Sequence, residues 1–273
     1  MIFPKFIRAL AAALLPGGLF ILTGCETVPE TGRSQLILIS PAQESQLGLQ
    51  SFTDTKKSVP ISKDASANAL VEKVGRRIAA VAGKDLPGAQ WEFVVFDSKD
   101  ANAFCLPGGK VGVYSGIFAV TKDEAGLATV IGHEVAHAVA RHGAERMSEA
   151  MLLQTGGSIL DASMANSDPR TKAAALLAYG LGSQLGRELP HSRAQESEAD
   201  HIGLIYMARA GYDPAAAVGF WQRFAAHNQQ HGGGSPPAFL RTHPLDEVRI
   251  QRIREQLPQA QAEYHRVRAG TGK

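Results

Sequence analysis

The sequence predicts an α+β fold that is mainly helical and carries one small antiparallel β-sheet. Segments rich in β-forming residues occur only within the first 114 residues, and a turn at 107–109 joins the last two of them. After these segments, apolar residues recur at helical spacing between capping residues, glycines and prolines. No internal repeat is visible, and the length of the chain suits a single catalytic domain with a tether.

The elements that precede the sheet are expected in the following order. Residues 26–34 are a polar linker, and Leu36–Ile39 is a short strand or extended segment. Ser40 and Gln43 form a capping box that starts a helix. A second helix covers 65–82, because its apolar residues share one face.

The sheet and the later helices follow from the same rules. Strands are predicted at 91–97, 102–106 and 110–114. The helices expected after the sheet cover 145–162, 170–186, 193–210, 213–227 and 244–256. A flexible loop is expected at 229–237, which is rich in glycine and proline. In domain terms, the sequence divides into a lipoprotein signal peptide (1–24), a lipidated tether (25–40), the catalytic domain (41–257) and a flexible C-terminal tail (258–273).

A further helix lies directly after the sheet. Thr121 and Glu124 read as a capping box at its start, and Gly143 reads as its C-terminal stop, with Arg141 and His142 in the last turn. An apolar stripe runs between these ends without proline. The segment is therefore predicted to be one well-capped helix.

This helix contains His133-Glu134-Val135-Ala136-His137. Residues four apart lie on one face of a helix, so His133 and His137 can bind one Zn²⁺. Glu134 stands beside them and can activate a water bound to the metal. The alternative is an ordinary helix that carries two hydrogen-bonded histidines.

A catalytic zinc site needs a third protein ligand. The best candidates are Glu196 and Asp200, which share a face of the predicted helix at 193–210. One could bind the metal while the other accepts a hydrogen bond from a ligand histidine. Glu198 is expected to point elsewhere, toward solvent or a salt bridge. The alternative is an acidic helix start favoured by the helix dipole.

The first 24 residues are expected to be an export signal, with Lys5 and Arg8 before an interrupted apolar run. The run ends in Leu22-Thr23-Gly24-Cys25, which resembles a bacterial lipobox, so Cys25 is the predicted lipidation site. Without Lys5 and Arg8, the basic residues equal the 26 acidic ones in number. This balance gives no reason to expect a nucleic-acid partner.

The motifs together resemble a known family. His133-Glu134-x-x-His137, the Ser192–Asp200 segment and Thr242-His243-Pro244 with Arg249 are similar to the HtpX-like and CAAX-prenyl-protease-type zinc metallopeptidases. The closest likeness is to the periplasmic lipoprotein branch typified by BepA and LoiP. Two further segments carry the same likeness, Thr31–Leu36 and Asn102–Gly109. The resemblance implies a zincin-like (gluzincin) domain.

The resemblance also implies roles for individual residues. His133, His137 and Glu196 would bind one zinc ion per chain, Glu134 would be the general base, and Asp200 would support a ligand histidine. His243 and Arg249 would face the active site, where His243 either stabilises the oxyanion or occupies the open zinc position as a latch. A substrate would pair with the edge strand formed by Asn102, Ala103, Phe104, Cys105 and Leu106.

Three matters are left open. Cys105 is either a small buried residue or a reactive thiol. His191 is either a spare ligand or pH-sensitive contact near the site, or an exposed loop histidine. The apolar stretch at about 150–190 is either a lid over the cleft, by resemblance, or two packed helices.

The predicted function is a lipid-anchored zinc metalloendopeptidase on the periplasmic face of the outer membrane. Its expected substrates are misfolded or misassembled envelope proteins, and the outer-membrane assembly machinery is a possible partner. The alternative is a chaperone or assembly factor that cleaves rarely. Cleavage is favoured because a protein that only binds has no need of Glu134. A structural zinc site is disfavoured, since such sites usually fill all four positions with Cys or His.

Overall fold

The computed structural model describes residues 24–231, 238–245 and 248–270. The predicted export signal, except Gly24, and most of the predicted loop at 229–237 lie outside these residues. The strands are β1 (Cys25–Thr27), β2 (Ser34–Leu36), β3 (Glu92–Phe96), β4 (Ala103–Leu106) and β5 (Lys110–Tyr114). The helices are α1 (Pro41–Ser58), α2 (Ala65–Ala82), α3 (Phe118–Thr121), α4 (Glu124–Val139), α5 (His142–Ser163), α6 (Pro169–Ser183), α7 (Leu189–Arg209), α8 (Ala216–His231), α9 (Ala238–Thr242) and α10 (Arg249–Gly270). The mainly helical fold with small sheets confirms the predicted fold class.

The first two helices begin where the sequence predicts. Ser40 caps α1, and Gln43 completes its capping box. Asp64 caps α2 by accepting hydrogen bonds from the backbone of Ser66 and Ala67. Local hydrogen bonds of this kind depend only on neighbouring residues, which explains why both starts were predictable.

The three-stranded sheet has the order β3-β5-β4, so β5 lies between two strands that precede it in the chain. β4 and β5 form the expected antiparallel hairpin through the turn at 107–109, whereas β3 pairs with β5 in parallel. The sheet is therefore mixed rather than wholly antiparallel. The insertion of β5 leaves β4 at the edge of the sheet, against α4.

Helix α4 is the centre of the domain, and every residue from Gly126 to Val139 is buried. The predicted start of this helix at Thr121 and its predicted stop at Gly143 were both wrong. Asp123, not Thr121, is the N-cap and accepts a hydrogen bond from the Gly126 amide at 2.8 Å. At the other end the helix stops before Arg141, whose φ of 54° is left-handed.

The unusual backbone at Arg141 has a tertiary cause. Its guanidinium pairs with Glu26 and Glu44 and donates to the carbonyl of Ile39. These contacts come from the hairpin of β1 and β2, here called the N-terminal hairpin, from α1, and from the segment that joins them. They offset the cost of a left-handed non-glycine residue. The chain therefore turns here, and the next helix starts at His142, one residue before the predicted stop at Gly143.

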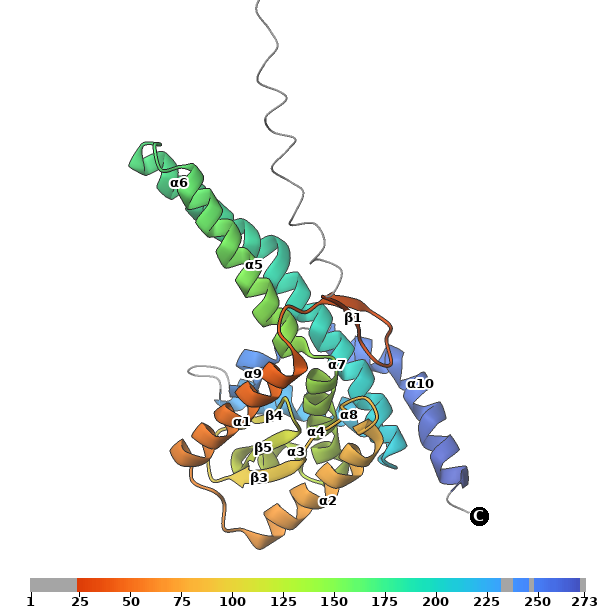
Figure 1. The fold of residues 1–273 in the computed structure, drawn as a ribbon. Coiled ribbons are helices and arrows are strands. Elements are labelled where there is room, and N and C mark those ends of the chain that lie inside the picture. Colours follow the sequence, from red (N-terminus) through yellow and green to blue (C-terminus); the bar gives the residue numbers. More distant parts are fainter. Residues whose placement is uncertain (1–23, 232–237, 246–247, 271–273) are drawn as a thin grey trace, which may run out of the picture.

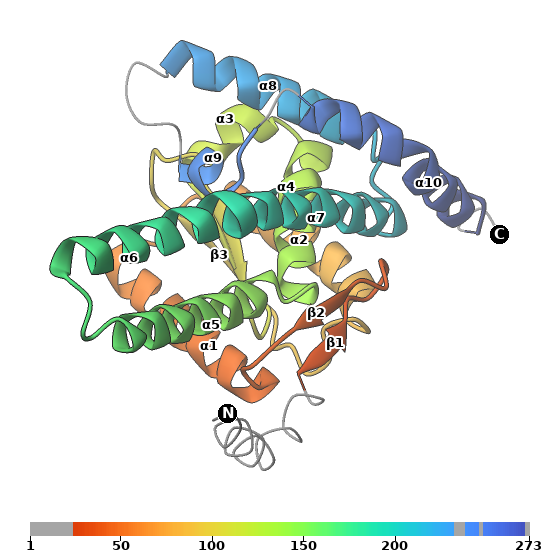
Figure 2. The same ribbon diagram turned by 90° about the horizontal axis from the view of Figure 1, so that it is seen from above.

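Helix α7 crosses α4 at close range (Figure 2). The crossing occurs at Gly132 and Gly203, where a Cβ on Gly203 would lie 3.0 Å from the His133 amide nitrogen. Figure 2 shows α8 and α10 on one side of α7, and α5 with the β1–β2 sheet on the other. Large buried aromatic side chains pack beside this crossing: Trp221 and Phe239 lie against the His133 ring, and Phe220 and Phe224 pack on Trp221.

Helices α5 and α6 form a hairpin that projects from the domain (Figure 1). A π-helical turn at Gln184–Glu188 joins α6 directly to α7. No residue of α6 is buried, and Ile159, Leu177 and Leu185 are about two-thirds exposed, at 65%, 64% and 65%. Of the two expectations for the 150–190 stretch, the structure shows packed helices. The lining of the cleft described below includes Gly143 and Arg146 at the base of α5, but no described residue of the 150–190 stretch.

The two ends of the described chain are more ordered than predicted. The expected polar linker contains β1 and the start of β2, which pair antiparallel with Cys25 opposite Leu36. The expected flexible tail is helical as far as Gly270, and Pro258 lies inside α10. Buried Ala260 and the Glu263–Arg209 ion pair hold this helix to the domain.

The last helix also starts later than predicted. A start near residue 244 was expected, but α10 begins at Arg249. His243 and Pro244 are thereby left in an irregular segment after α9. Within the described residues, no helix combines the length and the apolar composition that crossing a bilayer requires.

Candidate metal centre

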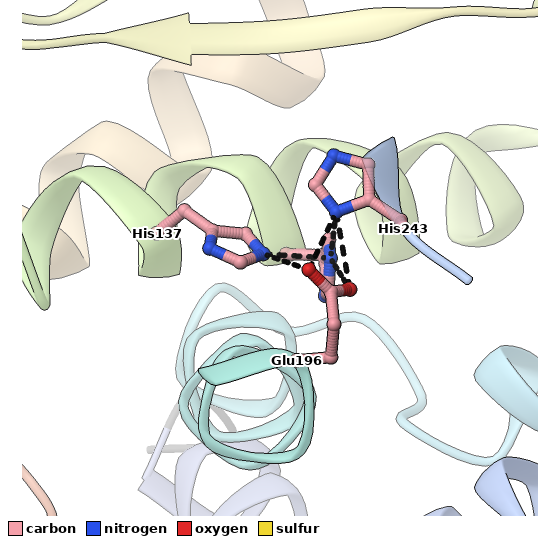
Figure 3. Close-up of side chains that lie close together, drawn as sticks. His137, Glu196 and His243 are labelled. Atoms are coloured by element: carbon pink, nitrogen blue, oxygen red, sulfur yellow. Dashed lines mark hydrogen bonds and ion pairs between the residues drawn. The ribbon is translucent and has the colours of Figure 1, made fainter. Parts of the chain in front are cut away.

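Four buried side chains converge at the crossing of α4 and α7. They are His133, His137, Glu196 and His243, and their nearest ligand atoms all lie within 4.8 Å of one another. Figure 3 shows His137 on α4, Glu196 rising from α7 and His243 entering from the opposite side. Three segments far apart in the sequence thus supply one cluster.

The ring nitrogens in the cluster face one another directly. His133 Nε2 lies 3.1 Å from both His137 Nε2 and His243 Nδ1. The Glu196 carboxylate lies 3.3 Å from each α4 histidine and 3.1 Å from His243 Nδ1. Burial alone would raise the pKa of Glu196, but hydrogen bonds from the three histidines hold it far below its usual value.

This donor set fits a zinc ion. Three imidazole nitrogens and a carboxylate are the ligand types that zinc prefers, and helical spacing presents both α4 rings to one point. A divalent cation bound at this centre would take the place of the ring protons that these histidines donate to Glu196. The residues present therefore fit the metal that the motif predicted.

Behind His133 lies the support that the sequence suggested. His133 Nδ1 is 3.0 Å from Asp200 Oδ1, so Nδ1 can donate while Nε2 faces the cluster. Arg249 binds both oxygens of Asp200, at 2.8 and 2.9 Å, and also lies 3.1 Å from Glu196. Its guanidinium stacks on Trp221, 3.7 Å from the ring centre. Sequence spacing left the roles of Glu196 and Asp200 open, and the structure places Glu196 in the cluster and Asp200 behind it.

Glu134 lies on the open side of the cluster. Its Oε1 is 3.2 Å from His243 Nε2, while His243 Nδ1 faces the metal ligands. Burial raises the pKa of the Glu134 carboxyl. His243 thus stands between the expected general base and the expected metal position.

A cleft opens onto Glu134 and is bordered by the edge strand β4. Its lining includes Glu134, His137 and His243, together with the strand residues Asn102, Ala103, Phe104, Cys105 and Leu106. The structure therefore brings the predicted substrate strand to the metal ligands. Cys105 is buried, and burial raises the pKa of its thiol, so this sulfur is a packing group rather than a reactive one.

Sequence reasoning missed a second set of buried polar residues. His142 is fully buried between His137 and Glu198, at 2.8 and 2.9 Å. Glu198 does form the expected salt bridge, to Arg33, but it is buried rather than directed to solvent. Helical spacing could not have predicted this contact, because the chain turns at Arg141 between α4, which carries His137, and α5, which begins at His142.

His191 is not a metal ligand. It lies on α7 rather than in a loop, is partly buried, and contacts Glu145 at 3.2 Å and Glu149 at 3.0 Å. Both carboxylates belong to α5, so His191 helps to hold the base of the projecting hairpin against α7.

A mainly helical domain with an HExxH pair on one helix and a glutamate ligand from another defines a zincin-like metallopeptidase. The model of peptidase family M48 matches residues 65–257. The chain is 35% identical over 260 residues to the mitochondrial metalloendopeptidase OMA1 of Schizosaccharomyces pombe, a match that covers 94% of this chain and 74% of that protein. The chain belongs to peptidase family M48, and it is a metalloendopeptidase.

Two other relatives match over a smaller share of their own length. The beta-barrel assembly-enhancing protease of Escherichia coli is 30% identical over 240 residues, covering 86% of this chain and 48% of that protein. Human mitochondrial metalloendopeptidase OMA1 is 35% identical over 251 residues, covering 88% of this chain and 47% of that protein. The chain therefore spans about half the length of these two relatives.

Proposed function

We propose that this protein is a lipid-anchored zinc endopeptidase of the bacterial envelope that degrades misfolded or misassembled proteins. The observation that carries the proposal is the convergence of His133, His137 and Glu196, with Glu134 beside them in an open cleft. The name of the E. coli relative links a similar protein to β-barrel assembly. The Leu22–Cys25 motif supports a lipid anchor, and Cys25 is exposed at the start of β1. The residue after this cysteine is Glu26 rather than Asp, which by resemblance to bacterial sorting rules favours the periplasmic face of the outer membrane.

In the proposed mechanism, His133 and His137 would hold zinc through Nε2, and Glu196 would hold it through its carboxylate. When bound, zinc would polarise the peptide carbonyl and acidify a water. Glu134 accepts the proton of the attacking water and transfers it to the leaving amine. Its buried position and raised pKa suit it to both steps. Asp200 and Arg249 keep the His133 ring oriented.

An extended substrate would bind along β4. This strand is at the edge of the sheet and borders the cleft, so its free backbone groups can pair with a substrate strand. Pairing of this kind uses main-chain hydrogen bonds, which tolerate many sequences. It therefore suits a protease that must accept different unfolded proteins.

Of the two roles for His243, the geometry supports the latch. Its Nδ1 lies among the zinc ligands and its Nε2 lies against Glu134, so it occupies the place where a water and a carbonyl must enter. Moving the segment after α9 would open the site. We expect His243→Ala to raise the rate of hydrolysis of a short peptide; a loss of activity would favour the oxyanion role instead.

The central test uses the purified protein and unfolded casein. We expect proteolysis that stops on addition of a zinc chelator and returns when zinc is restored. Glu134→Gln should abolish cleavage and retain zinc, because the amide cannot accept the proton. Cleavage that persists in chelator, or in Glu134→Gln, would contradict the proposal. Binding of unfolded protein without any cleavage by the wild type would favour a chaperone.

A further inference from the structure

The second nitrogen of His137 is held differently from that of His133. His133 Nδ1 lies directly against a carboxylate, that of Asp200. His137 Nδ1 instead lies 2.8 Å from Nδ1 of His142, which is fully buried. His142 Nε2 lies 2.9 Å from Oε2 of Glu198. A second imidazole therefore stands between this metal ligand and its carboxylate.

The carboxylate at the far end is held by the N-terminal hairpin. Thr31 donates to Glu198 Oε1 at 2.5 Å, and Arg33 Nε donates to Oε2 at 2.8 Å. The two outer nitrogens of Arg33 bind both oxygens of Glu145, at 2.7 and 2.9 Å. Arg33 is thus oriented by two buried carboxylates: Glu198 contacts His142, whereas Glu145 accepts a hydrogen bond from Gln195.

In the series of hydrogen bonds His137–His142–Glu198, the direction of the His137–His142 bond determines the direction of the other. If His137 uses Nε2 for the metal, its proton must be on Nδ1, and His142 Nδ1 must accept it. The proton of His142 is then on Nε2, where it donates to Glu198. Because a carboxylate can only accept, the hydrogen-bond series from Glu198 to His137 has one consistent set of proton positions.

The geometry points to His142, Glu198 and Arg33 as positioning residues that hold His137 in its metal-binding tautomer. The N-terminal hairpin, which begins at the predicted lipid attachment site, thereby becomes part of the support of the metal centre. This inference depends on the proposed use of His137 as a zinc ligand. Supporting groups of this type typically contribute about 10–100-fold to metal affinity.

The test measures zinc affinity by competition with a fluorescent chelator. His142→Phe keeps a ring of similar size but removes both nitrogens, and Glu198→Gln keeps the shape but removes the charge. Glu145→Gln is the matched control, because Glu145 also binds Arg33 but does not contact His142. We expect the first two variants to lose about tenfold or more in zinc affinity, and the control to stay within about threefold.

Three results would overturn the inference. If a folded Glu198→Gln or His142→Phe variant bound zinc with wild-type affinity, the hydrogen-bond series would not support the metal centre. An equal loss in Glu145→Gln would show a general effect on packing. The third comes from the wild type: long-range ¹H–¹⁵N NMR of the zinc-loaded protein should find the His142 proton on Nε2, and a proton on its Nδ1 would exclude the bond from His137.

If His142→Phe does not fold, the NMR measurement and the zinc affinity of Glu198→Gln still test the positioning role. A wild-type protein that binds no zinc would refute the proposed function itself. Wild-type protein that binds zinc, with variants that bind it equally well, would refute only this inference.

Discussion

The contact between α4 and α7 makes the metal centre sensitive to one methyl group. A Cβ on Gly203 would lie 3.0 Å from the His133 nitrogen and 3.1 Å from His133 Cα, whereas ordinary contacts begin at 3.4 Å. All of these atoms belong to the backbone of a buried helix, so they cannot rotate away. Gly203→Ala should therefore push α7 away from α4 by about 0.4 Å, as an overpacked core requires.

The shift moves Glu196, which is on α7, away from the two histidines on α4. Metal–ligand distances tolerate only about 0.2 Å, so we expect zinc affinity to fall on the order of tenfold. Overpacking costs about 1–3 kcal/mol, and replacing a helical glycine by alanine returns up to about 1 kcal/mol. The net loss of about 0–2 kcal/mol should lower Tm by a few degrees.

Two measurements check this prediction: chelator competition for zinc and thermal denaturation followed by circular dichroism. Gly180→Ala is the control, because Gly180 lies in α6 and its added Cβ would meet no atom within 4 Å. It should bind zinc like the wild type and unfold at the same or a higher temperature. Zinc affinity of Gly203→Ala equal to that of the control would refute the reasoning.

Three further predictions concern other parts of the structure. Burial lowers the pKa of His133, but the hydrogen bonds that its ring donates to Asp200 and Glu196 outweigh burial and raise the pKa to about 9. Zinc must displace a proton from this ring, so zinc affinity should rise about tenfold per pH unit up to that value. Calorimetry in buffers of different ionisation enthalpy should detect about one released proton. A flat affinity between pH 6 and 8 would contradict this. Arg249→Met should cost about 3–5 kcal/mol in urea denaturation because it leaves the buried Asp200 carboxylate without its cation; a change below 1 kcal/mol would show that the pair is not needed. Asp123→Ala removes the cap of α4 and should cost about 1 kcal/mol, whereas the same change at Thr121 should leave that cap intact, so equal effects would argue against the assignment.

Much of this protein was predictable from short-range patterns. The limits of α2, the capping box of α1 and the β4–β5 hairpin all follow from hydrogen bonds and side-chain periodicity within a few residues. The pairing of His133 with His137 has the same origin, because helical geometry alone places residues four apart on one face. These features needed no knowledge of the rest of the chain.

The tertiary structure decided what depends on contacts between distant segments. It placed β5 between β3 and β4, and it ended α4 early because Arg141 is held by Glu26 and Glu44. It showed that Glu196 belongs to the metal cluster and that Asp200 lies behind His133, although both residues share one face of α7. It also joined Arg33 to His142 through Glu198. Such contacts are set by how helices and strands pack across the core, and no local pattern in the sequence encodes them.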